Sequence, residues 1–182
     1  MNVLFLNACI RKESRTLRLC RAYLSGHCAG DTVEEVDVGR LPLHAMLQET
    51  LEAREADIHG GKLSGYIHAK AFAAADKIVI GAPYWDSSYP AILKIYIENI
   101  CVRGVTFESR PDGLHGLCNA KELVYITTAG GFVTENCSLK RHLQELCNMF
   151  GIEKLSFLLT EGLDMDVAKS EEILKSAIQK LG

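Results

Sequence analysis

The sequence has neither a long apolar run nor an excess of basic residues. Among its 182 residues, no apolar stretch approaches the roughly 20 residues that span a bilayer. Its 20 lysines and arginines are outnumbered by 23 acidic residues, which leaves a formal net charge of −3. We therefore expect neither a membrane nor a nucleic acid as partner. A signal peptide is not expected either, because the first apolar run is short and no charged region precedes it.

Common metal-binding and nucleotide-binding motifs are also missing. The seven cysteines are an odd number and no two are spaced C-x-x-C, which argues against a complete disulfide framework and against a zinc or iron–sulfur site. The six histidines show no H-E-x-x-H spacing, and G-x-G-x-x-G and Walker motifs are absent. We therefore expect no bound metal. The cysteines are expected to be free thiols in a reducing cytoplasm, and Cys9 is the one that lies in a candidate binding loop.

Apolar runs and helical patterns alternate along the chain. A hydrophobic content of 48% and a charged content of 24% are typical of a globular protein, and the length suits one domain, 1–182. The pattern predicts strands at 3–7, 32–38, 77–82, 122–128 and 154–160, and helices starting near Ser14 and at 45–58, 63–75, 91–103, 138–150 and 167–181. Because the apolar runs lack clean polar alternation, we expect an α/β fold with a doubly wound, five-stranded parallel sheet of order 2-1-3-4-5 and helices on both faces. Residues 104–121 are expected to form an excursion with a short hairpin.

Three loops of such a fold open at one edge of the sheet, those after the first, third and fourth strands. The first, residues 7–16, leads into a predicted helix, whose N-terminal N–H groups and dipole favour a phosphate. Ser14 and Thr16 add hydroxyl groups, and Arg11 and Arg15 add positive charge. A serine N-cap with solvated charges is the alternative interpretation of the same residues.

The loop after the third strand carries the only tryptophan of the chain. It reads Pro83-Tyr84-Trp85-Asp86-Ser87-Ser88-Tyr89-Pro90, so aromatic rings and a hydroxyl stand between two prolines. Pro90 is expected in the first turn of the following helix, which tolerates proline. This composition favours a loop that contacts a flat, partly apolar ring of a ligand. Aromatic packing beneath a turn is the alternative.

The loop after the fourth strand, Thr128-Ala129-Gly130-Gly131, contains two adjacent glycines. Glycines let the backbone approach a ligand closely, although a plain turn also uses them. Together the loops offer an anion site, an aromatic wall and bare backbone donors. Flavin mononucleotide (FMN) has a phosphate, a planar ring and a polar ring edge, and is therefore the predicted cofactor.

The same residues carry a resemblance to a known family. The motifs that match it are Pro83, Pro90-Ala91-Ile92-Leu93-Lys94, Gly104-Val105-Thr106-Phe107, Gly113, Gly116-Leu117, Lys121 and Gly130-Gly131. In these positions the chain resembles the FMN-dependent NADH-azoreductase and NAD(P)H–quinone oxidoreductase family of flavodoxin-like enzymes, over nearly its whole length. Two departures stand out. Ala8 replaces a serine usual in the family, and Tyr84-Trp85-Asp86-Ser87 replaces Met-Tyr-Asn-Phe.

The resemblance implies an enzyme that uses NADH or NADPH to reduce a quinone, an azo compound or a related small aromatic acceptor through FMN. It implies a homodimer and no catalytic side chain. The implied cofactor-binding residues are Arg11, Ser14, Arg15, Thr16, Pro83, Tyr84, Trp85, Asp86, Ser87, Thr128, Ala129, Gly130 and Gly131. Trp85 and Phe107 are the implied substrate-binding residues. A flavodoxin-type electron carrier without nicotinamide turnover and a flavin-free interaction domain remain the alternatives.

Overall fold

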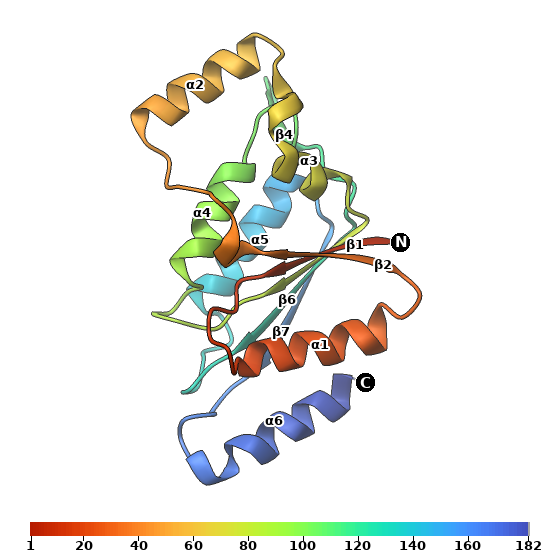
Figure 1. The fold of residues 1–182 in the computed structure, drawn as a ribbon, viewed down its shortest axis with the longest axis vertical. Helices are drawn as coiled ribbons and strands as arrows, with labels where there is room; N and C mark the ends of the chain where they lie inside the picture. The colour runs from red at the N-terminus through yellow and green to blue at the C-terminus, as the bar shows by residue number, and fades with distance from the viewer. Residues whose placement is uncertain (182) are drawn as a thin grey trace.

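A five-stranded parallel sheet runs through the middle of the protein in a computed structural model, which describes residues 1–181 (Figure 1). Its strands are β1 (Asn2–Asn7), β2 (Thr32–Asp37), β3 (Lys77–Gly81), β6 (Glu122–Thr128) and β7 (Lys154–Thr160). They lie in the order β2-β1-β3-β6-β7. Counted among these five strands alone, that order is 2-1-3-4-5, so the predicted doubly wound topology is confirmed.

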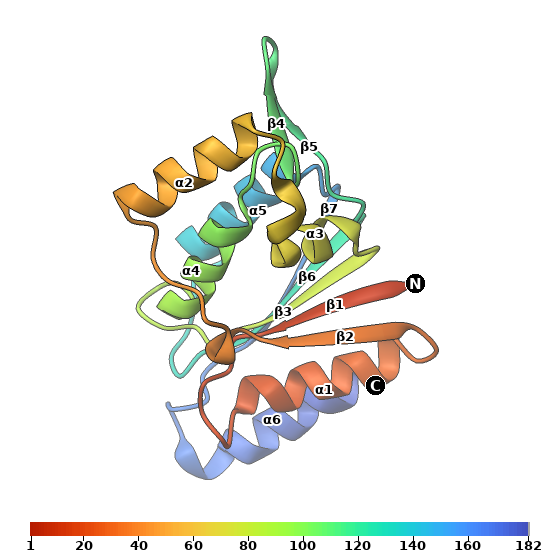
Figure 2. The same cartoon turned by 45° about the horizontal axis from the view of Figure 1, so that its top comes forward.

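Helices cover both faces of this sheet, as Figure 2 shows. Helices α1 (Arg15–His27) and α6 (Val167–Leu181) lie on one face. Helices α3 (Ile67–Ala74), α4 (Ala91–Ile100) and α5 (Ser138–Phe150) lie on the other. Successive side chains of a strand point to opposite faces, so Phe5 packs with Leu19 of α1, whereas Leu4 packs with Phe72 of α3 in a second cluster. Burial on both faces explains why the central strands β1, β3 and β6 are largely apolar, whereas the edge strand β2 is exposed and carries Glu34 and Glu35.

Two predicted helix boundaries differ from the structure near α4. Pro90 is the N-cap of α4, just before the first turn in which we expected it. The helix predicted over 91–103 ends at Ile100, because the buried hydroxyl of Thr106 donates to the Ile100 carbonyl at 2.8 Å. The same hydroxyl accepts from the Val102 N–H at 3.2 Å. A side chain that follows the helix thus satisfies backbone groups that another helical turn would have used.

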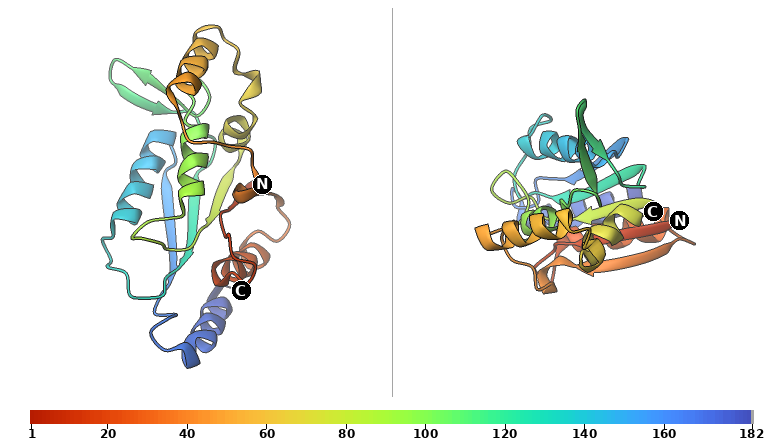
Figure 3. Two further views of the ribbon diagram at one scale, coloured as in Figure 1. Left: turned by 60° about the vertical axis from the view of Figure 1, so that its left-hand side comes forward. Right: turned by 90° about the horizontal axis from the view of Figure 1, so that it is seen from above.

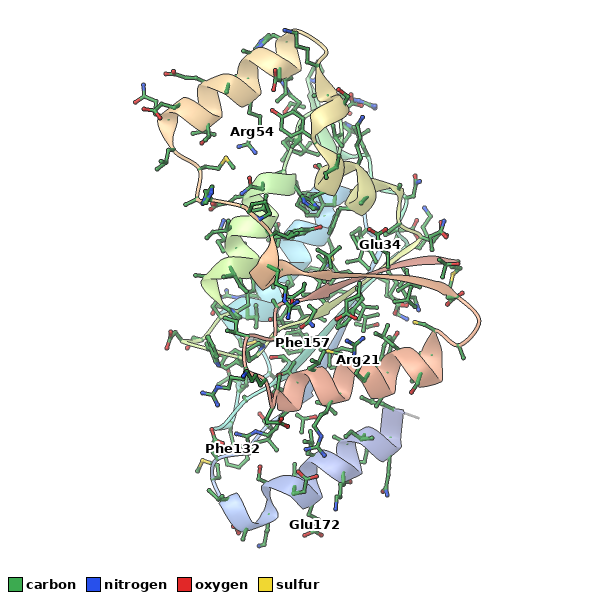
Figure 4. All side chains as sticks on the ribbon, in the orientation of Figure 1. Arg21, Glu34, Arg54, Phe132, Phe157 and Glu172 are labelled. Carbon is green, nitrogen blue, oxygen red and sulfur yellow. The ribbon has the colours of Figure 1, made fainter. Side chains whose placement is uncertain are left out.

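The segment between β2 and β3 departs furthest from the expected helices. A short 3-10 helix η1 (Val38–Arg40) follows β2, and α2 (Gln48–His59) begins three residues later than predicted. The helix predicted over 63–75 is divided into a 3-10 turn, η2 (Leu63–Gly65), and α3. Helix α2 has no buried residue. It is held to the end of α4 by Arg54, whose guanidinium donates to the carbonyls of Glu98 at 2.8 Å and Cys101 at 3.2 Å (Figure 4).

The excursion at residues 104–121 forms the predicted hairpin, with antiparallel strands β4 (Phe107–Arg110) and β5 (Gly113–Gly116). Figure 3 shows this hairpin and α2 standing out at the same end of the molecule, away from α1 and α6. Within residues 1–181, no helix has the length and apolar character needed to cross a membrane. The same residues contain no cluster of three or more His, Cys, Asp or Glu placed to hold a metal ion.

Candidate functional site

A cavity of about 220 Å³ opens beside the loops that follow β1, β3 and β6. It is lined by Ile10, Arg11, Glu13, Ser14, Arg15, Thr16, Pro83, Tyr84, Trp85, Thr128, Ala129, Gly130, Leu163 and Asp164. The carboxyl ends of parallel strands meet at one edge of the sheet, which is why loops far apart in the sequence share one cavity. The structure therefore brings the three chemically distinctive loops together.

The N-terminus of α1 forms one wall of this cavity. Ser14 is the N-cap residue, with extended backbone angles, and its hydroxyl oxygen accepts from the Leu17 N–H at 3.1 Å. The N–H groups of Arg15 and Thr16 lie in the first turn, where no earlier helical carbonyl can accept from them. They add to the positive end of the helix dipole. This wall therefore offers donors to an anion.

Two hydroxyl groups connect this wall to the loop after β6. The Thr16 and Thr128 side-chain oxygens are 2.6 Å apart, and Thr16 is almost fully buried. Each hydroxyl carries one proton, and a single proton suffices for the bond between them. The second proton remains available to a ligand in the cavity. The pair thus fixes the two loops relative to each other and still provides a donor.

Arg15 lines the cavity, but its guanidinium is largely occupied by the loop after β7. It donates to Asp164 at 2.7 Å, to the Leu163 carbonyl at 3.0 Å and to the Ser170 hydroxyl at 2.9 Å. The Asp164 N–H in turn donates to the Gly130 carbonyl at 2.9 Å. Arg15 therefore ties α1 to the loop after β7, and its charge is shared with a carboxylate.

Gly130 lies directly against the Asp164 side chain. A Cβ atom at Gly130 would be 2.2 Å from the Asp164 Oδ2 atom and 3.2 Å from its Cβ atom. A Cβ atom at this position would therefore displace the Asp164 carboxylate, which pairs with Arg15. At Gly131, by contrast, an added Cβ would meet no other heavy atom within 4 Å. The two adjacent glycines thus differ in how closely they are packed.

The aromatic loop makes a tight two-residue turn. Trp85 and Ser88 exchange backbone hydrogen bonds of 2.9 and 2.7 Å. The two central residues, Asp86 and Ser87, have φ values of 49° and 62°, as in a type I′ turn. Left-handed backbone costs a non-glycine residue roughly 1–2 kcal/mol. The Arg11 guanidinium lies 5.9 Å from the centre of the Trp85 ring, so the first loop and the aromatic loop are in contact.

Four sequence-predicted residues do not line the cavity. Asp86 and Ser87 occupy the tip of the tight turn, and Gly131 lies beyond the lining residues. Phe107 is in β4, in a separate groove that also includes Arg54. A single chain therefore does not bring Phe107 to the cavity that Trp85 lines.

The sequence interpretation missed four residues that line the cavity, namely Ile10, Glu13, Leu163 and Asp164. The last two belong to the loop after β7, which opens at the same edge of the sheet as the others. Gly162 precedes them and has a φ of +75°. A glycine soon after a strand is the sequence signal that could have predicted a turn there. The loop after β7 is not among the three loops that the sequence predicts to form the site.

A larger cavity, of about 740 Å³, lies between α6 and the strands β6 and β7. Much of its lining is aliphatic and includes Leu19, Ile126 and Ile173. It runs along one face of the sheet and includes none of the residues of the loops after β1 and β3. Specific ligand sites combine an apolar surface with converging polar groups. The smaller cavity at the carboxyl edge has that combination and is therefore the candidate site.

Comparisons with known proteins place this geometry in a family. The family model for the flavodoxin-like fold matches residues 1–182. Over 189 aligned residues, the chain is 31% identical to the FMN-dependent NADH:quinone oxidoreductase 2 of Clostridium acetobutylicum. That alignment covers 98% of this chain and 94% of the relative.

Two solved structures from Bacillus anthracis share the fold. An azoreductase superposes with a TM-score of 0.84 at 23% identity, covering all of this chain and 96% of the other. An FMN-dependent NADH-azoreductase, solved in complex with FMN, superposes with a TM-score of 0.83 at 20% identity, covering 99% and 95% of the two chains. On the full-length match to the family model and the relative from Clostridium, this chain belongs to the flavodoxin-like fold family.

Proposed function

We propose that this protein is an FMN-dependent NAD(P)H oxidoreductase that reduces quinones, azo compounds or related aromatic acceptors. The observation that carries the proposal is the meeting of a helix N-terminus, an aromatic loop and a glycine-containing backbone loop in one cavity. The relative from Clostridium is named as an FMN-dependent NADH:quinone oxidoreductase. The homologous chain from Bacillus anthracis was solved with FMN bound.

The residues present fit FMN in their chemistry. Ser14 and the first turn of α1 would hold the phosphate, together with the proton left over from the Thr16–Thr128 pair. Arg11 adds positive charge near the phosphate, and its guanidinium lies 5.9 Å from the centre of the Trp85 ring. Tyr84 and Trp85 would contact the ring, and the backbone from Thr128 to Gly130 would face its polar edge.

The bound flavin would supply the redox chemistry, accepting a hydride from the nicotinamide and passing electrons to the acceptor. The protein's own residues bind and orient it. The buried methyl group of Ala8 belongs to the hydrophobic core, so this position provides no hydroxyl for the phosphate. The phosphate site therefore depends on the first turn of α1, on the Thr16–Thr128 pair and on Arg11.

The proposal is tested on the purified protein by its cofactor and its reaction with nicotinamide. Mass spectrometry of the released cofactor should identify FMN, and NADH or NADPH should bleach the yellow flavin without air. A protein that binds FMN but is bleached by neither nucleotide would be an electron carrier. A protein that remains colourless after reconstitution with FMN would be an interaction domain.

We also propose that the protein is a homodimer whose partner covers the flavin. The cavity of one chain, at about 220 Å³, is smaller than the roughly 300–1,000 Å³ of typical ligand pockets, so part of the cofactor would protrude. Ile10, which lines the cavity, is 54% exposed, and Phe132, two residues after Gly130, is 74% exposed (Figure 4 labels Phe132). Exposed apolar surface of this kind marks contact sites. The Phe107 hairpin of a second copy is our candidate for the cover.

Light scattering tests the dimer. The unmodified protein should have twice the mass of one chain, and Phe132→Asp should shift it toward the monomer. Val33→Asp is the matched control, because Val33 is an exposed apolar residue near the amino-terminal end of β2. A monomer that reduces quinone at nanomolar concentration would contradict the proposal.

The same crowded site predicts a ping-pong reaction. We propose that the nicotinamide and the acceptor occupy the same place beside Trp85 in turn, so the nicotinamide must leave before the acceptor binds. Double-reciprocal plots against quinone at several NADH concentrations should give parallel lines. Intersecting lines would indicate a ternary complex. We propose the cytoplasm as the site of this reaction, supported by seven cysteines that are all free thiols.

A further inference from the structure

Two cysteines meet beneath the candidate phosphate site. Cys9 lies in the loop between β1 and α1, and its thiol donates to the Gly81 carbonyl at 3.5 Å. Cys20 lies in α1 and is completely buried, and a Cβ atom built on Gly81 would be 2.4 Å from its sulfur. The two sulfur atoms therefore lie against the same glycine at the end of β3.

The two thiols differ in accessibility and acidity. The hydrogen bond from Cys20 lowers the pKa of Cys9, and burial only partly opposes this effect. A further hydrogen bond, with Ser14, acts in the same direction. For Cys20, the contact with Cys9 and complete burial both raise the pKa. Cys9 is also partly exposed. A partly exposed thiol with a lowered pKa beside a second thiol is the arrangement found in redox-sensing cysteines.

Other cysteines of the chain do not share this environment. Burial raises the pKa of Cys101 to about 11, of Cys118 to about 12 and of Cys147 to about 11. These thiols therefore remain protonated and react slowly with oxidants, because the thiolate is the reactive form. Selective oxidation should begin at Cys9.

We propose that Cys9 and Cys20 form a dithiol that a hydroperoxide converts to a disulfide, and that this conversion weakens the binding of FMN. In the first step the Cys9 thiolate attacks hydrogen peroxide, the O–O bond breaks, and Cys9 sulfenic acid and hydroxide form. In the second step the Cys20 thiol displaces that hydroxyl group as water and the S–S bond forms. Two thiols and one peroxide thus give one disulfide and two waters, and the peroxide accepts two electrons.

The effect on FMN rests on the proposed function and on the position of the pair. Ser14 contacts Cys9, and Thr16 lies one helical turn before Cys20 on the same side of α1. A disulfide bond is about 2.05 Å long, shorter than any contact between two thiols, so we expect its formation to draw the loop toward α1. That movement displaces the hydroxyl groups that would hold the phosphate.

Peptide mapping tests the dithiol without reference to the cofactor. The protein, with and without FMN, is treated with hydrogen peroxide, alkylated under denaturing conditions and digested. Cys9 and Cys20 should be linked in the unmodified protein and in the control Cys28→Ala, whose cysteine follows the same helix. In Cys20→Ala, Cys9 should accumulate as a sulfenic acid that dimedone traps. Linkage of Cys9 to another cysteine, or its oxidation to sulfinic acid without linkage, would overturn the proposal.

Fluorescence titration with FMN tests the coupling. Peroxide should raise the dissociation constant about tenfold, or ~1.4 kcal/mol, and dithiothreitol should restore it. Cys28→Ala should respond in the same way, whereas Cys9→Ser should not respond to peroxide. Riboflavin, which lacks the phosphate, should be affected less. Unchanged FMN affinity in a fully linked protein would overturn the coupling. Failure of the reduced protein to bind FMN would instead refute the proposed function, and the mapping would still decide the disulfide.

Discussion

The two edges of the central sheet use their polar groups differently. At the amino-terminal edge, Glu122 begins β6 between Lys77, which begins β3, and Lys154, which begins β7. Its carboxylate is 3.1 Å from the Lys77 ammonium and 2.7 Å from that of Lys154. The amino terminus of the chain pairs with Asp31 at 2.8 Å at the same edge. The charged groups at this edge therefore form ion pairs with one another.

At the carboxyl-terminal edge, several polar groups have capacity left for a ligand. The first-turn N–H groups of α1 have no helical acceptor, and the Thr16–Thr128 pair retains one proton. The aromatic loop at the same edge also keeps an unfavourable left-handed backbone at Asp86 and Ser87. At one edge of the sheet the charged groups therefore pair with one another and stabilise the fold. At the other edge, hydrogen-bond donors remain available to bind a ligand. Substitutions at the two edges should separate stability from binding.

The largest expected effect on binding comes from Gly130→Ala. The new methyl group would collide with the Asp164 carboxylate, which would have to turn away and lose its hydrogen bond with Arg15 in the wall of the cavity. We expect the FMN dissociation constant to rise about 100-fold, or ~2.7 kcal/mol, in a fluorescence titration. Gly131→Ala is the matched control, since its methyl group would enter open space, and its effect should be much smaller. Equal effects of the two substitutions would contradict this packing argument.

The next effect should come from removing two hydroxyl groups of the phosphate site. Ser14→Ala with Thr16→Ala should weaken FMN binding by roughly 1.5–3 kcal/mol, the cost of losing a hydrogen bond to a charged group. Riboflavin binding should weaken less. Parallel titrations with the two ligands measure the difference. If both ligands lose the same affinity, the phosphate is bound elsewhere.

At the opposite edge, Glu122→Gln should reduce stability and leave FMN binding unchanged. Burial by itself raises the pKa of Glu122, but hydrogen bonds from Lys154, Ser156 and Lys77 outweigh it and lower the pKa to about 2. The ionised carboxylate therefore stabilises the fold above its ordinary pKa of 4.5, and this contribution is lost as the pH falls toward 2. The substitution should cost about 1–2 kcal/mol at neutral pH.

Urea unfolding between pH 7 and pH 2 measures this contribution. The unmodified protein should lose stability more steeply than Glu122→Gln below about pH 4.5, so the two curves should converge in acid. Curves that remain parallel down to pH 2 would show that Glu122 does not stabilise the folded state through its charge.

The smallest effect is expected from Glu171→Gln, away from both edges. Glu171 pairs with Arg18 between α6 and α1, but both side chains are about half exposed. Water and salt screen such pairs, so the melting temperature and the FMN affinity should both stay unchanged. A lowered melting temperature would mean that the contact between these helices depends on this pair.

Much of the scaffold was predictable because it depends on local sequence patterns. Apolar runs such as the one that precedes Gly81 are long enough to be strands and too short for the helices seen elsewhere. Ser14 marks the start of α1 by the preference of serine for the N-cap. The acidic pattern of α2 predicts a helix but not the residue at which it begins, because this helix buries no residue against the rest of the protein.

Local sequence patterns predict the alternation of strands and helices, the topology that follows from it, and the three loops at the carboxyl edge. Which side chains meet there depends on the tertiary structure. It paired Arg15 with Asp164, it placed Cys20 beside Cys9, and it left Phe107 outside the cavity. Local patterns follow from helix and strand periodicity, whereas contacts between residues as far apart as 15 and 164 depend on how the whole sheet is assembled.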